Sequence, residues 1–277
     1  KAPSIIRAIK EEQKEIQNII AEYKIDGIIS DNRYGVYSDK IPSIFLGHQI
    51  RVLPPKLFRW GSGIILLWHK SFLKKFNEIW IPDFEDENNL SGILSHDLSI
   101  KLPIKYIGPQ SRFSSYDLSK ETKNNKIVAV LSGPEPQRTF FEQKITEQLQ
   151  EINTPSVLIR GVVEERKNQQ KGNLTIKNYL HSRDLLEEIS NAKCIICRPG
   201  YSTMMDLSLF GKKVILIPTP GQTEQEYLAE NLSKQGKAVV QKQKSFHLKE
   251  AILRLDGIDC LPISKWNNDL LDQEIVR

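Results

Sequence analysis

Cysteine and long hydrophobic runs are scarce in this sequence. Only 3 cysteines occur among 277 residues, and this odd number argues against a disulfide-stapled secreted scaffold and favours a reducing cytosol. The longest apolar runs, such as 64–68, fall far short of the roughly 20 residues that a membrane-spanning helix needs, and no signal-peptide pattern opens the chain. The sequence therefore predicts a cytoplasmic protein, either soluble or attached peripherally to a membrane.

The motifs of several common site types are also missing. No HExxH, paired CxxC, Walker loop or catalytic serine elbow occurs, which argues against a metalloprotease, a zinc module, a P-loop NTPase and a lipase. The one CxxC spacing, from Cys194 to Cys197, falls in a predicted strand, where residues three apart point to opposite faces, so it indicates core packing. The net charge of +5 is too small to require nucleic acid as a partner and is consistent with an anionic ligand. No metal or cofactor is predicted.

Length and composition favour two lobes of the α/β class. The chain is longer than one hydrophobic core usually supports, and its 39% apolar and 26% charged residues are typical of globular proteins. We expect a first lobe over 1–105, a linker rich in Ser, Pro, Gly and Lys over 106–125, and a second lobe over 126–260. The C-terminal segment 261–277 is a candidate to pack back on the first lobe.

Helical and strand-like patterns alternate along both lobes. The first lobe begins with an amphipathic helix over 4–23 and continues with strands at 25–30, 42–46 and 78–82. In the second lobe the predicted strands are 126–131, 156–160, 174–177, 194–197 and 213–217. The predicted helices there are 139–151, 184–190, 202–210 and 223–235, and the Lys-, Gln- and Glu-rich stretch 164–171 is expected to be an exposed loop. This order predicts two Rossmann-like lobes with parallel sheets.

Three loops of the second lobe each follow a predicted strand and lead into a helix. They span 132–134, 197–206 and 218–226, and glycine and proline bend each of them. In open parallel sheets, ligands bind at the carboxyl ends of the strands, where the N–H groups at helix starts favour anions. Ser202 is a candidate N-cap of its helix. The pattern predicts one pocket for a ligand that carries phosphate.

Each loop also has a purely structural interpretation. Ser132 and Gly133 fit an ordinary turn between strand and helix, and Asp206 fits an acid that complements a helix dipole. Thr223 followed by Glu226 fits a capping box.

The loop motifs resemble those of a known enzyme class. Arg198-Pro199-Gly200 with Asp206, followed by Pro218 and Glu224-Gln225, is similar to the donor-binding half of the GT-B nucleotide-sugar glycosyltransferases, and closest to family 28. The resemblance covers most of the second lobe and is fainter over the first. It implies a metal-independent hexosyltransferase that moves a sugar from a nucleoside diphosphate, with UDP as the expected carrier, to a cell-envelope or polysaccharide acceptor with inversion. The acceptor would be a sugar or a lipid-linked molecule.

The resemblance also implies roles for individual residues. Ser132 and Gly133 would face the donor phosphates, Leu180 would contact the base, and Asp206 would bind the ribose. The other implied donor-site residues are Gly200, Tyr201, Ser202 and Thr203 at the diphosphate, Glu224 and Gln225 at the sugar hydroxyls, and Arg198 without a more specific role.

The sequence departs from the family pattern in four respects. Pro199 stands where the family often has Ser or Ala, and Leu228 stands where it often has Asn. Asp206 replaces a more usual Glu, so its reach to a ribose is shorter. The family's opening βα unit, with its Gly-rich loop and a His often proposed as catalytic, has no counterpart, so we expect the chain to begin after it and the first lobe to be incomplete.

Direct displacement at the anomeric carbon needs a base that removes a proton from the acceptor hydroxyl. His48, at a strand end in the first lobe, is the candidate base, and Asp31 is the alternative carboxylate. A core histidine is the competing interpretation of His48, and the missing opening unit is another place for the base.

The segment 51–77 carries six basic residues and no Asp or Glu, interleaved with aromatic side chains. Such a surface suits the inner face of an anionic membrane or a lipid-linked acceptor. Core packing of the aromatic rings beneath a solvated basic face is the alternative.

Two other functions remain open on the sequence alone. A nucleotide-sugar hydrolase or epimerase could use the same scaffold, because a fold does not fix a reaction. A non-catalytic donor-binding subunit would depend on another chain to recognise the acceptor.

Overall fold

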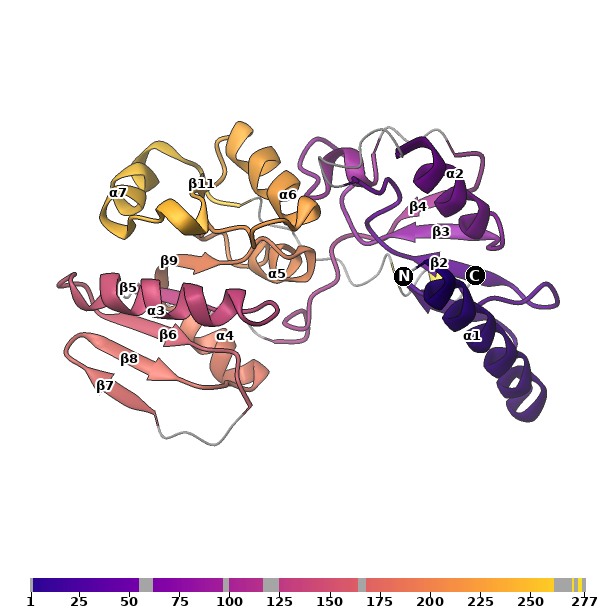
Figure 1. Cartoon of the computed structure of the whole chain (residues 1–277), viewed down its shortest axis with the longest axis horizontal. Helices are drawn as coiled ribbons and strands as arrows, with labels where there is room; N and C mark the ends of the chain where they lie inside the picture. Colours follow the sequence, from indigo (N-terminus) through magenta and orange to yellow (C-terminus); the bar gives the residue numbers. More distant parts are fainter. Residues whose placement is uncertain are drawn as a thin grey trace. The chain divides into compact units, whose positions relative to one another are not determined.

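The chain divides into two units in the computed structural model, which describes residues 2–54, 62–96, 100–116, 125–163, 168–261, 271, 274 and 275. Unit 1 comprises 1–109 together with 269–277, and unit 2 comprises 110–268 (Figure 1). The boundary falls inside the segment predicted as a linker. The first residues after it, 110–116, belong to unit 2 and are not a spacer.

Unit 1 is built on a four-stranded parallel sheet in the order β1-β2-β3-β4. Its elements are α1 (Ala2–Tyr23), β1 (Ile28–Asp31), β2 (Ser43–Leu46), α2 (Ser62–Leu73), β3 (Glu78–Ile81), the 3-10 turn η2 (Gly92–Leu94) and β4 (Ile104–Tyr106). Side chains of β2 and β3 on one face of the sheet form a core with Leu73 and Phe76. Strand β4 was not predicted, because it is short and lies beside the segment without clear periodicity.

Unit 2 is built on a seven-stranded sheet in the order β11-β10-β9-β5-β6-β8-β7, parallel except for β7 at one edge (Figure 1). Its first elements are β5 (Lys126–Val130), α3 (Gln137–Gln150), β6 (Ser156–Ile159), β7 (Gln169–Lys171), β8 (Leu174–Lys177), α4 (Ser182–Ser190) and β9 (Ala192–Cys197). The remaining elements are α5 (Tyr201–Leu207), β10 (Lys213–Leu216), α6 (Thr223–Lys234), β11 (Val239–Val240), η3 (Gln243–Ser245), α7 (Leu248–Leu253) and η4 (Arg254–Gly257).

Both faces of the unit 2 sheet are buried. Helices α3 and α7 contribute Phe141, Ile145, Leu149, Leu248 and Ala251 to one large core. The alternate residues of the same strands point to the other face of the sheet, and those such as Val128, Ile195 and Val214 are also inaccessible to solvent. Burial on both faces is typical of a parallel sheet and explains why its strands read as continuous apolar runs.

Most predicted elements of unit 2 are confirmed, with local differences. The stretch predicted as an exposed loop at 164–171 includes β7, an exposed strand that pairs antiparallel with β8; residues 164–167 lie outside the described part. Cys194 and Cys197 are buried in β9, and burial raises the pKa of both thiols to about 12, so their packing role is confirmed.

The segment 51–77 is described only in part. Phe76 is buried, and Trp68 and Phe72 pack around the ring of Tyr34, which supports core packing for these aromatic side chains. Residues 55–61, with two of the aromatic and two of the basic side chains, lie outside the described residues. Among the described helices, none combines the length and apolar character needed to cross a bilayer.

The close approach of Gly161 to the end of β5 generates the first prediction. Gly161 has φ +69°, and a Cβ there would lie 2.5 Å from the backbone oxygen of Leu131. Because of this clash and the left-handed backbone, Gly161→Ala should lower the free energy of unfolding by about 3 kcal/mol. Gly172 is the matched control, because it has φ +57° with open space around it, and its alanine variant should lose only about 1 kcal/mol. Urea unfolding followed by circular dichroism measures both losses, and equal losses would contradict the prediction.

Candidate functional site

The three predicted loops leave the unit 2 sheet side by side. Strands β10, β9 and β5 are neighbours, and Cys197 is in register with both Leu216 and Val130 at their carboxyl ends. The first and third loops also approach each other, because a Cβ on Gly133 would lie 3.5 Å from the Thr219 side-chain oxygen. Gly133 has φ +102°, a conformation that favours glycine. The chain thus brings all three loops to one edge of the sheet.

Arg198, in the second loop, connects that loop to the third loop, to the start of α3 and to η3 from inside the protein. Its guanidinium donates to the backbone oxygens of Ile217, at 2.8 Å, and Pro218, at 3.2 Å. It also donates to the backbone oxygen of Gln137, at 3.3 Å, and to the side-chain oxygen of Gln243, at 2.5 Å. With only 1% of its surface exposed, Arg198 keeps its side chain inside the protein and not on the surface of the loops.

The environment of Arg198 is otherwise apolar. Its guanidinium lies over the ring of Phe141 at 4.6 Å, and its buried Nε has no hydrogen-bond partner. Burial lowers its pKa to about 10, so the side chain remains charged at neutral pH. The cost of burying this charge is offset by four protein acceptors and the aromatic face.

The second loop presents its backbone in front of helix α5. Gly200 is the N-cap residue, with φ −74°, which corrects the prediction that Ser202 has this role. A Cβ on Gly200 would meet only Thr203 within 4 Å, at 3.8 Å, so the space beside its backbone is open. Ser202 is exposed and Thr203 half-buried, whereas the Tyr201 side chain is buried, so Tyr201 could offer a ligand its backbone N–H only.

Asp206 lies at the far end of the short helix α5, not in its first turn. Asp206 is 7% exposed, and its carboxylate accepts hydrogen bonds from Ser111 Oγ at 2.6 Å and Arg112 Nε at 2.9 Å. Burial raises its pKa, although Ser111 and Arg112 act in the opposite direction. Sequence reasoning missed both partners, because they lie in the segment predicted as a linker. Complementing the dipole at the start of α5 is therefore not the role of Asp206.

The third loop is closed by side chains of α6. Gln225 Oε1 accepts from the backbone N–H of Thr219 at 2.8 Å, and Glu226 accepts from the backbone N–H of Gly221 at 3.2 Å. Helix α6 has Gln222 as its N-cap without a side-chain bond, so the proposed capping box of Thr223 and Glu226 is wrong. The hydroxyl of Thr219 is buried without a hydrogen-bond partner.

The remaining donor-site candidates lie at the same edge of the sheet or in the loop closed by α6. Ser132 is exposed two residues after the end of β5, and Leu180 is half-buried three residues after the end of β8. Glu224 is half-buried in the first turn of α6, beside Gln225.

The unit 1 candidates lie at the carboxyl edge of their own sheet. Asp31 ends β1, is exposed, and is in register with Leu46 at the end of β2; half-buried His48 follows two residues later. Sequence reasoning missed Asp83, which is fully buried after β3 and accepts from the backbone N–H groups of Leu90 and Ser91. The described residues hold no group of three His, Cys, Asp or Glu side chains suited to a metal ion.

Comparisons with known proteins agree with this arrangement. The sequence model of the "Glycosyltransferase family 28 C-terminal domain" matches residues 127–260. A UDP-N-acetylglucosamine--N-acetylmuramyl-(pentapeptide) pyrophosphoryl-undecaprenol N-acetylglucosamine transferase from Desulforudis audaxviator (strain MP104C) is 38% identical over 71 residues. That match covers 25% of this chain and 18% of the relative.

Solved structures share the fold at low identity. The glycotransferase of kitacinnamycin superposes with a TM-score of 0.63 at 14% identity, over 91% of this chain and 74% of that one. MurG of Acinetobacter baumannii superposes with a TM-score of 0.53 at 15% identity, over 93% and 72%. The fold is therefore that of the GT-B glycosyltransferases, as the sequence predicted. The family 28 C-terminal domain model matches most of unit 2.

The contacts of Arg198 generate the second prediction. In Arg198→Lys a single ammonium cannot reach acceptors on both sides, so the free energy of unfolding should fall by about 2–4 kcal/mol. The matched control is Arg254→Lys, an exposed position where we expect a change within about 0.5 kcal/mol. Urea unfolding followed by circular dichroism tests both variants. If the midpoint for Arg198→Lys equals that of the parent protein, the loops do not depend on this guanidinium.

Proposed function

We propose that this protein transfers a sugar from a nucleoside diphosphate, with UDP as the carrier, to an acceptor hydroxyl with inversion at the anomeric carbon. One observation carries the proposal: three loops meet at one sheet edge, and the backbone at Gly200 is open to a ligand. The family 28 match over the same unit supports this donor class. The N-acetylglucosamine transferase activity of the partial relative supports an acceptor of the cell envelope.

Unit 2 is proposed to stabilise the nucleoside diphosphate as it leaves the sugar. Backbone N–H groups at 201–203 and at 132–133 are the proposed donors to its oxygens, because they begin helices or follow a strand end. The Glu224 carboxylate and the Gln225 amide are proposed to orient the sugar hydroxyls. Leu180 is proposed to lie against the base, and Asp206 to contact the ribose while it is held by Ser111 and Arg112.

The acceptor and the base are assigned to unit 1. His48, with Asp31 as the alternative, is proposed to remove the acceptor proton as the new glycosidic bond forms. The acceptor is proposed to be a sugar or lipid-linked molecule of the cell envelope, and segment 51–77 is proposed to make peripheral contact with the inner face of the membrane. No metal or cofactor is part of this proposal.

Gly200 gives a direct test of donor binding, which is the third prediction. Because a side chain at this position would point into open space, Gly200→Val should leave the urea midpoint nearly unchanged while it blocks close approach of a diphosphate. UDP should raise the melting temperature of the parent protein, and calorimetry should show UDP affinity at least about tenfold lower in the variant. Gly257→Val, on a turn remote in sequence from the loops and also free of neighbours within 4 Å, is the control.

Product analysis distinguishes the transferase from its alternatives, and this is the fourth prediction. Incubation of UDP-sugars with acceptor alcohols and with water alone should release UDP only when an acceptor is present, with the sugar on the acceptor. His48→Gln should lower the rate about 100-fold or more and leave UDP affinity unchanged. Free sugar formed at the same rate in water identifies a hydrolase instead. Binding of UDP with no turnover of any donor identifies a donor-binding subunit.

A further inference from the structure

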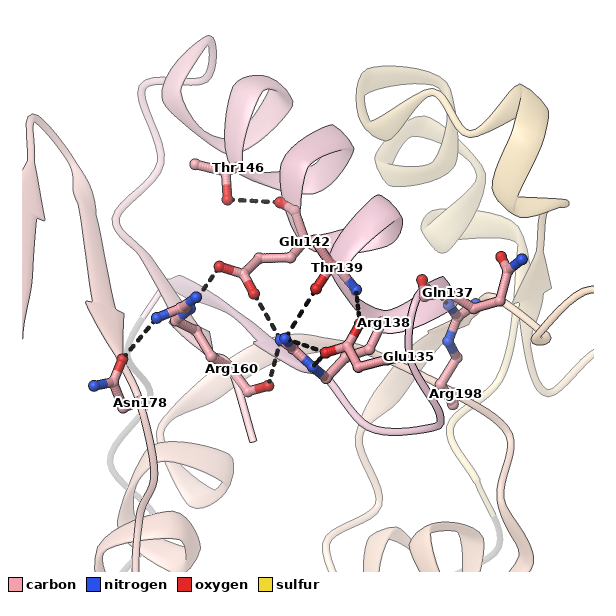
Figure 2. Close-up of polar contacts among 9 residues, drawn as sticks. All are labelled: Glu135, Gln137, Arg138, Thr139, Glu142, Thr146, Arg160, Asn178 and Arg198. Carbon is pink, nitrogen blue, oxygen red and sulfur yellow. Dashed lines mark hydrogen bonds and ion pairs between the residues drawn. The ribbon is translucent and has the colours of Figure 1, made fainter. Parts of the chain in front are cut away.

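Buried ion pairs run along the carboxyl edge of the unit 2 sheet, beside the proposed donor site (Figure 2). Glu142, on α3, is the central group: one of its oxygens accepts from Arg160 Nε at 2.5 Å and the other from Arg138 Nη1 at 2.6 Å. Arg138 reaches on to Glu135, with Nε 2.6 Å from its carboxylate. The side chains of Glu142, Arg138 and Arg160 are at most 16% exposed. The two arginines and two glutamates carry no net charge between them.

The network ends at Asn178, which immediately follows β8. Arg160 Nη1 donates to the side-chain oxygen of Asn178 at 3.0 Å, and the backbone oxygen of Asn178 accepts from Val162 at 3.0 Å. Asn178 is buried, so this pairing fixes both its side chain and its backbone. Leu180, the residue proposed to contact the base, lies two residues further along the chain.

The other side of the network borders the proposed phosphate loop. Gly161 packs closely against the backbone oxygen of Leu131, and Arg138 also donates to the backbone oxygen of Arg160 at 3.3 Å. Ser132 and Gly133 follow Leu131 directly. The buried charges therefore fix the ends of β6 and β8 relative to α3, and the approach of Gly161 to Leu131 places the end of β5 beside them. The loops after β5 and β8 are the two that would contact the two ends of a nucleoside diphosphate.

Stability alone is a weak reason for such a network. Buried ion pairs cost desolvation, and well-packed apolar side chains of similar volume often stabilise a protein as well. Arginine instead offers a rigid planar fork that sets the direction of each partner, which suits positioning. In this network the fork of Arg160 spans Glu142 on α3 and Asn178 on the strand end.

We infer that Arg160, acting through Asn178, is a positioning residue that sets the nucleobase preference of the donor site. It does not touch the donor; it holds the backbone of 178–180 at the place where the base is read. This inference rests on the proposed function, because it needs a nucleoside diphosphate as the ligand. It goes further by assigning base selectivity to residues beneath the site.

The test is the fifth prediction and compares nucleoside diphosphates that share the diphosphate and differ in the base. Calorimetry gives the ratio of the ADP and UDP dissociation constants for each variant. Arg160→Lys keeps a charge opposite Glu142 but cannot hold both partners, and Asn178→Ser replaces the amide acceptor with a shorter hydroxyl. Each should therefore shrink the ratio about tenfold through weaker UDP binding. Asn178→Asp retains an oxygen acceptor for Arg160 and should keep the ratio within about twofold of the parent protein.

Glu135→Gln is the matched control within the same network. Glu135 is half-exposed and contacts Arg138 and Thr139 but not Arg160, so the ratio should not change. A general structural role would weaken UDP and ADP binding equally in Arg160→Lys and Asn178→Ser, and this result would overturn the inference. So would a parent protein that binds UDP and ADP equally well. If the parent protein binds no nucleoside diphosphate, that result contradicts the proposed function itself, and the inference about Arg160 is contradicted with it.

Discussion

The candidate site depends on one buried cation, the guanidinium of Arg198. Backbone oxygens of the third loop and of the start of α3 converge on it, and these segments are far apart in the sequence. Loops at the edge of a sheet are ordinarily its most mobile parts. A charge that needs several acceptors at once opposes this mobility, because separating these segments would leave it incompletely bonded. The second and third loops can therefore be rigid before any ligand arrives.

Periodicity and strand ends were sufficient to predict the architecture of unit 2. Continuous apolar runs identify strands buried on both faces, and parallel order brings the following loops to one edge. Short elements were missed by this reasoning: β4 and β7 are three residues long and β11 only two, and so few residues carry no measurable period. The six-residue helix α7 was also not predicted. The role of Arg198 escaped it for a different reason. A motif gives the spacing of residues along the chain, but whether a side chain points to solvent or into the core depends on acceptors elsewhere in the sequence.

The polar interior of unit 2 is concentrated at the edge where function is proposed. The apolar core beneath α3 and α7 needs no specific partners, whereas the arginines of this edge each require directed acceptors. Gln137 and Arg138 are adjacent in α3, and the first accepts from Arg198 while the second contacts Glu142. The first turn of α3 thus joins the acceptors of Arg198 to the ion pairs around Glu142. The directed polar contacts fix the conformation of the loops, and the apolar core supplies most of the stability of unit 2.

The bond between Asp206 and the first residues of unit 2 has a mechanical consequence. Ser111 and Arg112 come directly after the boundary at Pro109, so the polypeptide that enters unit 2 is anchored to α5 before it reaches the first strand of the sheet. Tension in the incoming chain would act first on helix α5, whose N-cap is Gly200. The chain that enters unit 2 is therefore attached, before any strand, to the helix that follows the second loop.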